Sequence, residues 1–273
     1  MELTELAKTL EKRAPVLRGR ILRMINSAHA GHPGGSLSAI DMIQTVLVGW
    51  GHFDPTDHNK DWFVLGKGHA APAFYSVLVE LGYLPEDELL TYRKLGSRLQ
   101  GHPDRNKLPF VQVNTGHLGQ GLSLGVGLAL AERLRSSNKK VYVILGNGDL
   151  NEGQTWEAIQ SAAKFSLSNL IIFLDENKLT QEGIATDIMN VYPLSQKIEN
   201  FGWTVKDIDG HNYLEMLCSL NNFKSNQSGP IWFTCNTIKG KGVSFMENVP
   251  QWHSADLPDD LLKKALQELG LSE

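Results

Sequence analysis

Four short apolar runs, separated by longer stretches with helical patterning, constrain the fold of this sequence most strongly. They are residues 62–65 (W-F-V-L), 141–145 (V-Y-V-I-L), 170–174 (L-I-I-F-L) and 230–235 (P-I-W-F-T-C). None alternates with polar residues, so each fits a strand that is covered on both faces. Helices between such strands are typical of βαβ crossovers. The sequence therefore predicts an α/β fold with a doubly wound, mainly parallel sheet flanked by helices.

The chain has no repeat, low-complexity tract or long Pro/Gly/Ser linker that would divide it. Its 273 residues, 41% of them hydrophobic, are enough to bury a full core. We therefore expect a single domain over residues 1–273. The first thirteen residues resemble an amphipathic helix, and the last segment resembles a terminal helix that ends at Gly270.

Charge and cysteine content exclude several classes of function. The formal net charge is −4, and no stretch concentrates Lys and Arg, so a nucleic acid or an anionic membrane surface has no electrostatic support as a partner. Cys218 and Cys235 are the only cysteines and lack a C-x-x-C spacing, which argues against a disulfide framework or a zinc site. With no signal peptide and no membrane-spanning stretch, the sequence predicts a cytoplasmic location.

A glycine-rich turn, Gly146-Asn147-Gly148-Asp149, follows the second apolar run and precedes a helix expected to begin near Gly153. It would lie at the carboxyl end of a parallel strand, where ligands of open α/β sheets bind. Taken alone, the turn is also typical of a plain strand-to-helix connection in which Asn or Asp caps the helix. The end of the next strand adds Asn177. Oxygen-bearing side chains at two strand ends can hold Mg²⁺ against a diphosphate.

The order of several motifs resembles that of transketolases. G-N-G-D-L-N-E-G-Q-T-W-E-A followed by D-E-N-K-L-T-Q-E-G resembles the thiamine diphosphate motif of this family. Further signatures in the family's order are S-A-H-A-G-H-P-G-G-S-L-S from residue 27, L-G-K-G-H-A from 65, Q-G-H-P-D from 100, T-G-H-L-G-Q-G-L-S from 115 and K-G-K-G-V-S-F-M-E-N-V-P-Q-W-H from 239. Together they span most of the chain.

The resemblance implies thiamine diphosphate and Mg²⁺, or another divalent cation, as cofactors. Motif matching predicts Asn147, Asn177 and the backbone carbonyl of Leu179 as metal ligands. The predicted cofactor-binding residues are His69, Gly116, Leu118, Gly119, Gly146, Gly148, Asp149, Asn177 and His253. In this family the cofactor supplies the carbanion chemistry, while the protein orients and stabilises it.

The resemblance also assigns catalytic candidates. His32, His69, His102 and His253 match histidines of the family's substrate channel, where imidazole suits both hydrogen bonding to sugar hydroxyls and proton transfer. Any one of them alone would more often be a structural or surface histidine. Glu152 resembles a buried carboxylate that links two active sites, and it is equally typical of an acid in the first turn of a helix. His29 has no matching role.

The matched motifs imply an incomplete active site. A whole transketolase continues into a pyrimidine-binding domain and a C-terminal domain, which we expect on a partner chain. The resemblance thus predicts the N-terminal half of a split transketolase, inactive alone and forming an α2β2 heterotetramer with a C-terminal transketolase subunit. It would transfer a two-carbon ketol unit from a ketose donor to an aldose acceptor, as in pentose phosphate metabolism. An apolar surface is expected at the carboxyl ends of the strands.

Two residues depart from the family's pattern. Asn147 stands where the family usually has Asp, which removes one negative charge from the predicted metal site. His117 stands where Pro is common. These departures favour a specialised transketolase with a different donor or acceptor. Alternatives are a related thiamine enzyme, such as a deoxyxylulose-phosphate synthase or a dehydrogenase E1 subunit, and a non-catalytic regulatory relative. A Rossmann nucleotide binder is disfavoured, because no G-x-G-x-x-G follows a first strand.

Overall fold

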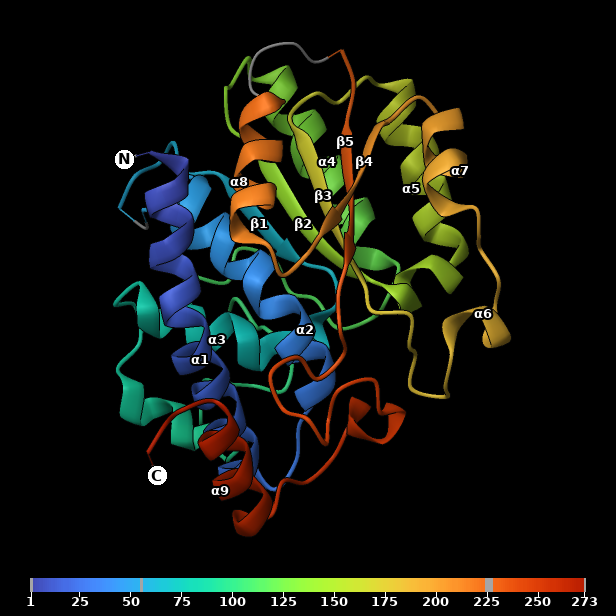
Figure 1. The fold of residues 1–273 in the computed structure, drawn as a ribbon. Coiled ribbons are helices and arrows are strands. Elements are labelled where there is room, and N and C mark those ends of the chain that lie inside the picture. Colours follow the sequence, from blue (N-terminus) through green and yellow to red (C-terminus); the bar gives the residue numbers. More distant parts are fainter. Residues whose placement is uncertain (1, 55, 224–227, 273) are drawn as a thin grey trace.

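The computed structural model describes residues 2–54, 56–223 and 228–272, and it contains a five-stranded parallel sheet in the order β1-β2-β3-β5-β4 (Figure 1). The strands are β1 (Trp62–Leu65), β2 (Val141–Gly146), β3 (Leu170–Glu176), β4 (Thr204–Asp209) and β5 (Ile231–Asn236). The helices are α1 (Leu3–Ala28), α2 (Pro33–Gln44), α3 (Ala71–Glu80), α4 (Gln120–Leu134), α5 (Gly153–Lys164), α6 (Ala185–Ile188), α7 (Leu194–Asn200), α8 (Tyr213–Asn222) and α9 (Asp259–Glu268). The predicted parallel α/β fold is confirmed.

One strand, β4, has no counterpart among the four predicted runs. Its residues, T-V-K-D-I-D, mix charged and apolar side chains, and only Ile208 among them is buried. The strand pairs with β5 alone, and five of its six residues are exposed or half-buried. Exposed positions of an edge strand tolerate charge, so the continuous apolar run that identified the other four strands, including the buried edge strand β1, does not develop here.

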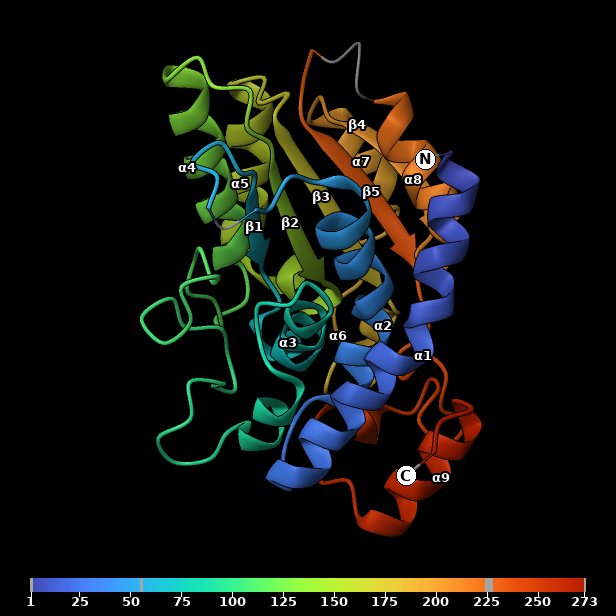
Figure 2. The same ribbon diagram turned by 90° about the vertical axis from the view of Figure 1, so that its left-hand side faces the viewer.

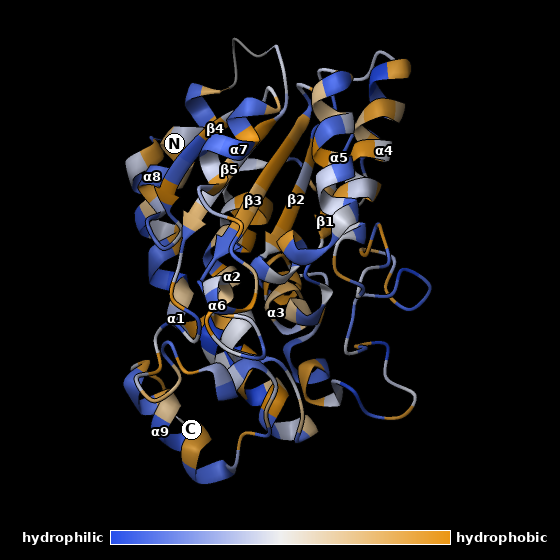
Figure 3. Ribbon diagram, turned by 90° about the vertical axis from the view of Figure 1, so that its right-hand side faces the viewer, coloured by the Kyte–Doolittle hydropathy of each residue, from blue (hydrophilic) through white to orange (hydrophobic). Residues whose placement is uncertain are grey.

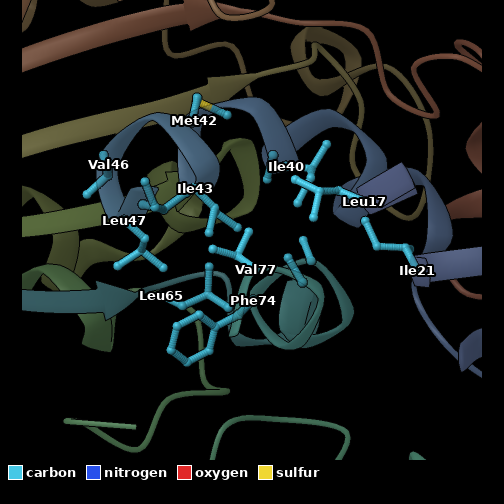
Figure 4. Close-up of a cluster of buried hydrophobic side chains, with 14 of the residues drawn as sticks. Leu17, Ile21, Ile40, Met42, Ile43, Val46, Leu47, Leu65, Phe74 and Val77 are labelled. Carbon is cyan, nitrogen blue, oxygen red and sulfur yellow. The ribbon is translucent and has the colours of Figure 1, made fainter. Parts of the chain in front are cut away.

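The sheet separates two hydrophobic cores. On one face, side chains from α1, α2, α3 and α8 pack against alternate strand residues such as Leu65 and Ile144. Figure 4 shows part of this cluster, where Ile43 and Leu47 approach Phe74 and Val77. On the other face, α4, α5 and α7 cover the intervening residues, including Trp232. Helices therefore cover both faces of the sheet (Figure 2), and β2 and β3 are apolar (Figure 3) except at the carboxyl end of β3, which is Asp175-Glu176.

The strand register aligns the carboxyl ends of the central strands. Gly146 of β2 lies opposite Asp175 of β3, and Glu176 lies opposite Asn236 of β5. The predicted turn after β2 forms a short 3₁₀ helix over Asn147–Asn151, and α5 begins at Gly153 as expected. The polar residues that follow β2 and β3 are thus brought to one edge of the sheet.

The two ends of the described chain are helical, as the sequence indicates. The amino-terminal helix is longer than its amphipathic start suggests, since α1 reaches Ala28. The carboxyl-terminal helix α9 ends just before Gly270, whose φ is +70°. Within the described ranges, no helix is both long and apolar enough to cross a membrane.

Candidate active site

A cavity of about 350 Å³ opens at the carboxyl ends of β2 and β3. Its lining includes twelve of the residues that the sequence predicts for the site: His32, His69, His102, Gly116, Leu118, Gly146, Asn147, Gly148, Glu152, Asn177, Leu179 and His253. These residues come from segments that are far apart in the sequence. The fold therefore assembles one site from motifs that were identified separately.

Asp149 and Gly119, both predicted to bind the cofactor, are not among the lining residues. The Asp149 carboxylate is fully buried and accepts the backbone N–H groups of Gly119 and Gly146, each at 2.9 Å. Burial raises the pKa of Asp149 to about 6, and the two N–H donors oppose that shift. Asp149 thus joins the turn after β2 to the loop before α4. Both segments contribute to the lining of the cavity, through Gly148 and Leu118 respectively.

Two glycines keep the cavity open where the loops approach closely. A Cβ on Gly148 would lie 2.7 Å from the Cδ1 atom of Leu118, which is closer than side-chain atoms pack. A Cβ on Gly116 would lie 3.3 Å from the His102 ring. The backbone of Gly148 can therefore approach a ligand without a side chain between them.

A hydrogen-bonded group of Ser38, Lys67, Asp175 and Asn177, called the floor here, lies at one side of the cavity: Lys67 and Asn177 line it, and Ser38 and Asp175 are fully buried next to them. Lys67 and Asp175 form a buried ion pair, and the Lys67 ammonium also donates to the Gly35 carbonyl at 3.0 Å. Asp175 accepts further hydrogen bonds from Ser38 Oγ at 2.6 Å and from Asn177 Nδ2 at 3.0 Å. Burial alone would raise the pKa of Asp175, but the Lys67 charge and the hydrogen bonds from Lys67, Ser38 and Thr237 together lower it.

The floor fixes the direction of the Asn177 side chain. Because Nδ2 donates to Asp175, the amide oxygen points away from the floor and accepts the Leu179 N–H at 3.1 Å. One lone pair of this oxygen remains, and both Asn177 and Leu179 line the cavity. These two residues fit the role of oxygen donors for a hard cation.

Asn147 is oriented differently. Its Oδ1 atom accepts the backbone N–H groups of Asn177 at 3.1 Å and Lys178 at 3.2 Å. Two N–H donors require an acceptor, so the amide oxygen must face them. This oxygen, predicted as a metal ligand, has both lone pairs engaged by the backbone.

Glu176, next to Asn177, was not identified from the sequence. Only 2% of its surface is exposed, and burial raises the pKa of its carboxyl group. Oε1 accepts a hydrogen bond from the Tyr192 hydroxyl, whereas Oε2 is buried without a hydrogen-bond partner. The Tyr192 hydroxyl and the Asn147 side chain oppose the effect of burial and lower the pKa of Glu176 in part.

The histidine wall of the cavity consists of His32, His69, His102 and His253. The ring centroid of His32 lies 5.2 Å from that of His69, 6.5 Å from that of His102 and 5.6 Å from that of His253. Burial, together with neighbouring positive groups, lowers the pKa of His32 to about 4 and that of His253 to about 3. The pKa values of His69 and His102 are lowered for the same reasons, chiefly burial. All four imidazoles are therefore neutral at pH 7.

Lys239 adds a cation beside this wall. Its ammonium donates to the Thr180 carbonyl at 2.8 Å and lies 2.9 Å from His253 Nδ1. Burial and repulsion from Lys67 lower the pKa of Lys239 to about 8. Lys67 and Lys239 belong to motifs that carry the resemblance, yet only the histidines of those motifs were predicted to act in the site. For Lys67, its place between two glycines was the available signal, whereas Lys239 follows Ile238 and is preceded by no glycine.

The remaining predicted residue, Glu152, is exposed at the cavity and occupies the N-cap position of α5 without a side-chain cap bond. Its proposed place in a network between active sites stays a prediction. His117 is exposed and does not line the cavity. His29 also lies outside it and contacts Asp256. Among the residues that the structure describes, no three His, Cys, Asp or Glu side chains converge as a metal cluster.

An orphaned polar atom tests whether thiamine diphosphate fits this site. His32 Nδ1 is buried and has no hydrogen-bond partner within the described chain, so a bound ligand could supply one. The open space over Gly148, the neutral imidazoles and the Lys239 ammonium suit a ligand with both an anionic and an uncharged polar part. The residues present fit the cofactor. For the metal, Asn177 and Leu179 fit, and Asn147 does not.

Comparison with known proteins defines the class. Residues 11–273 match the family model described as "Transketolase, thiamine diphosphate binding domain". The chain belongs to this transketolase family, and the predicted fold, family and enzyme class are confirmed. The cofactor prediction is confirmed for thiamine diphosphate, the ligand for which the family is described.

Individual relatives refine the match. An apulose-4-phosphate transketolase subunit from Actinobacillus succinogenes is 40% identical over 95% of this chain and 95% of its own length. A 6-deoxy-6-sulfo-D-fructose transketolase subunit from Clostridium sp. is 38% identical, over 95% and 96% respectively. The crystal structure of Campylobacter jejuni transketolase superposes with a TM-score of 0.90 at 31% identity, covering 97% of this chain. The chain spans only 43% of that transketolase, whereas it matches nearly the full length of the two bacterial subunits, so it corresponds to one half of a split transketolase.

Proposed function

We propose that this chain is the thiamine diphosphate-binding subunit of a split transketolase, which transfers a two-carbon ketol unit from a ketose donor to an aldose acceptor. The observation that carries the proposal is the convergence of four neutral imidazoles on one cavity at the carboxyl ends of β2 and β3. The relatives that share its length are named as transketolase subunits. Their names point to specialised sugar phosphates or sulfosugars as substrates for this chain too.

The residues at the carboxyl ends of β2 and β3 would bind the diphosphate and its cation. Gly146 and Gly148, at the end of β2, would let the diphosphate approach the backbone, and a divalent cation such as Mg²⁺ would be held by Asn177 and Leu179. Bound thiamine diphosphate would supply the carbanion chemistry. Since its hydrogen bonds to Asp175 and to the Leu179 N–H fix the Asn177 side chain, this proposed ligand would be oriented before a cation enters.

The histidine wall would act on the sugar. A neutral imidazole offers one N–H donor and one acceptor nitrogen, so it can hydrogen-bond a hydroxyl and exchange a proton with it. The ring centroids of His253 and His69 lie 5.3 Å apart, and we assign these two residues to the cofactor side of the cavity. His32 and His102 are assigned to sugar hydroxyls. Glu152 would act at the interface between active sites.

A partner subunit would complete the site. The cavity is open, and the apolar side chains of Ile184, Ile188 and Met189 are 52%, 48% and 55% exposed around α6, at the same end of the sheet (Figure 1). Exposed apolar groups beside an open ligand cavity are typical of a surface that another chain covers. We infer a C-terminal transketolase subunit with the pyrimidine-binding domain, an α2β2 heterotetramer, and a role in cytoplasmic sugar metabolism.

Native mass spectrometry of the complex from its own host, with Mg²⁺ present, tests the proposal. We expect a tetramer of two chain types that carries thiamine diphosphate and a metal. The same complex should then transfer ketol units from at least one of apulose 4-phosphate, 6-deoxy-6-sulfofructose and xylulose 5-phosphate. A lone chain or a homodimer without cofactor would contradict the proposed function and favour a regulatory relative.

A further inference from the structure

The Lys239 side chain is buried in a single position beside the histidine wall. Only 1% of its surface is exposed, and its ammonium contacts the Thr180 carbonyl and His253 Nδ1. Its stem packs against α2, because a Cβ on Gly34 would lie 3.0 Å from Lys239 Cγ. A lysine side chain has many rotamers, so holding the ammonium in one place requires that the backbone at residue 239 is also held.

Two side chains hold the backbone on either side of Lys239. His211, from the loop between β4 and α8, accepts the Ile238 N–H with its Nε2 atom, and the two nitrogens are 2.9 Å apart. Arg18 of α1 donates from Nε to the Lys241 carbonyl at 3.0 Å. Ile238 precedes Lys239 directly, and Lys241 follows it by two residues. The segment that carries Lys239 is therefore anchored at both ends.

Asp41 of α2 joins these two anchoring side chains. Its Oδ2 atom accepts from Arg18 Nη2 at 2.6 Å and lies 2.7 Å from His211 Nδ1, and Asp41 is only 2% exposed. Because the Ile238 N–H can only donate, His211 Nε2 is the acceptor, and Nδ1 carries the proton that is donated to Asp41. We call Arg18, Asp41 and His211 the clamp. Buried hydrogen-bonded networks of this kind make a structure rigid.

The contact between Lys239 and His253 selects one tautomer of this imidazole. An ammonium has only N–H donors, so His253 Nδ1, which is 2.9 Å away, is the acceptor. In a neutral ring the proton is then on Nε2. His253 lines the cavity, and with Nδ1 engaged the hydrogen-bonding atom that remains for a ligand is an N–H donor.

We propose that the clamp positions Lys239, and that Lys239 in turn holds His253 as an N–H donor towards the bound ligand. The inference rests on the proposed function, because His253 acts there as part of the histidine wall. Arg18, Asp41 and His211 do not line the cavity, so they are positioning residues that act through Lys239. Without the Lys239 contact, a neutral imidazole exchanges between its two tautomers and is a donor at Nε2 only part of the time.

Nitrogen NMR of the full chain with isotope-labelled histidine measures the tautomer of His253, because protonated and unprotonated ring nitrogens have well-separated chemical shifts. His253→Gln assigns the signal. In the parent we expect an unprotonated Nδ1 and a protonated Nε2. Lys239→Met retains an unbranched side chain and loses the ammonium, so the shifts of the two His253 nitrogens should move towards a common average.

Two substitutions at His211 test the clamp itself. His211→Gln can place its amide oxygen near the position of Nε2 and still accept the Ile238 N–H, whereas the amide of His211→Asn lies near the position of Nδ1 and is too short to do so. We expect His211→Asn to average the His253 tautomers. It should also lower kcat/KM of the complex with its partner subunit by about tenfold, mainly through kcat, since misplaced active groups cost up to about 10²-fold. His211→Gln should restore both measurements towards the parent values.

Tyr213→Phe is the matched control for general stability. The Tyr213 hydroxyl donates to Asp41 Oδ1 at 2.6 Å, so its loss disturbs the same carboxylate without removing either anchor of the Lys239 segment. We expect a lower melting temperature, with the His253 tautomer and kcat/KM at parent values.

The proposal is overturned if the parent has its His253 proton on Nδ1, or if Lys239→Met or His211→Asn keeps the parent's tautomer. It is also overturned if His211→Gln is no better than His211→Asn, or if Tyr213→Phe lowers kcat/KM as much as His211→Asn does. A parent complex that transfers no ketol unit overturns the proposed function. The clamp is still decided in that case, because the tautomer is measured on the chain without substrate.

Discussion

The floor of the cavity and its histidine wall are built in opposite ways. In the floor, the Lys67 ammonium and the Asp175 carboxylate are buried, paired and surrounded by further hydrogen bonds. In the wall, the imidazoles contact one another mainly through their rings, and His32 Nδ1 has no partner within the described chain. The floor holds Asn177 in one orientation, while the wall keeps hydrogen-bonding capacity for a ligand.

Because of this difference, floor residues should contribute mainly to the stability of the fold and wall residues mainly to the binding and conversion of substrate. Removing one member of a buried ion pair leaves an uncompensated charge, which destabilises a protein strongly. Removing an imidazole with few partners costs little stability, but it removes a group that can bind or exchange a proton with a substrate. Substitutions in the two regions should therefore affect different measurements.

Lys67→Met should produce the largest effect on stability. The variant leaves the Asp175 carboxylate buried without its cation, and we expect the free energy of unfolding to fall by about 3–5 kcal/mol. Urea denaturation of the full chain measures this quantity. Lys8→Met is the matched control, since Lys8 pairs with Glu5 on the surface, and its loss should cost less than about 1 kcal/mol. Equal losses in the two variants would show that the floor pair contributes no more than a surface pair.

His102→Ala should change activity and leave stability nearly constant. His102 is exposed at the cavity, so truncation of its side chain removes few stabilising contacts. With the sugar donor that the complex accepts, we expect kcat/KM to fall by about 10²-fold, within the range for a lost acid–base or hydrogen-bonding group. Steady-state kinetics and thermal melting are measured on the same preparation.

His58→Ala is the matched control for this experiment. His58 is an exposed histidine that does not line the cavity, so both kcat/KM and the melting temperature should stay at parent values. If His102→Ala also turned over at the parent rate with an unchanged KM, His102 would not contact substrate, and the wall would be smaller than proposed.

Much of the fold could be predicted from the sequence, because buried parallel strands leave a simple signal. The apolar runs that begin at Trp62, Val141 and Leu170 became β1, β2 and β3 almost residue for residue. The strand β4 has no such signal, since five of its six residues are exposed or half-buried, whereas β1 at the other edge of the sheet is buried over three of its four residues. The apolar pattern therefore identifies a strand only where helices cover it on both faces.

The site could be predicted where each residue belongs to a motif, and not where its role depends on a partner distant in sequence. Twelve matched residues line one cavity. Asp149 instead bonds Gly119 and Gly146, a role that requires two loops to meet. The direction of the Asn147 amide depends likewise on the backbone N–H groups of Asn177 and Lys178, which meet it only in the folded chain.

The pH dependence of stability should distinguish the wall from the floor. Its expected effect is smaller than those of Lys67→Met and His102→Ala. His32 and His253 have pKa values of about 4 and about 3 in the folded protein, below the usual value of about 6.5. Between about pH 6.5 and pH 4 the unfolded chain binds protons that the folded wall does not, so stability should fall as pH falls through this range. The Lys67–Asp175 ion pair of the floor should lose its contribution to stability only at lower pH, because the lowered pKa of Asp175 keeps the pair charged until pH is below the usual carboxylate range.

Thermal melting of the parent and of His32→Gln from pH 8 to pH 4 measures the loss of stability that comes from the wall, and the variant should show the shallower decline. A variant as steep as the parent would mean that His32 takes up a proton in the folded state as readily as in the unfolded one, and the wall would then not be a set of neutral imidazoles.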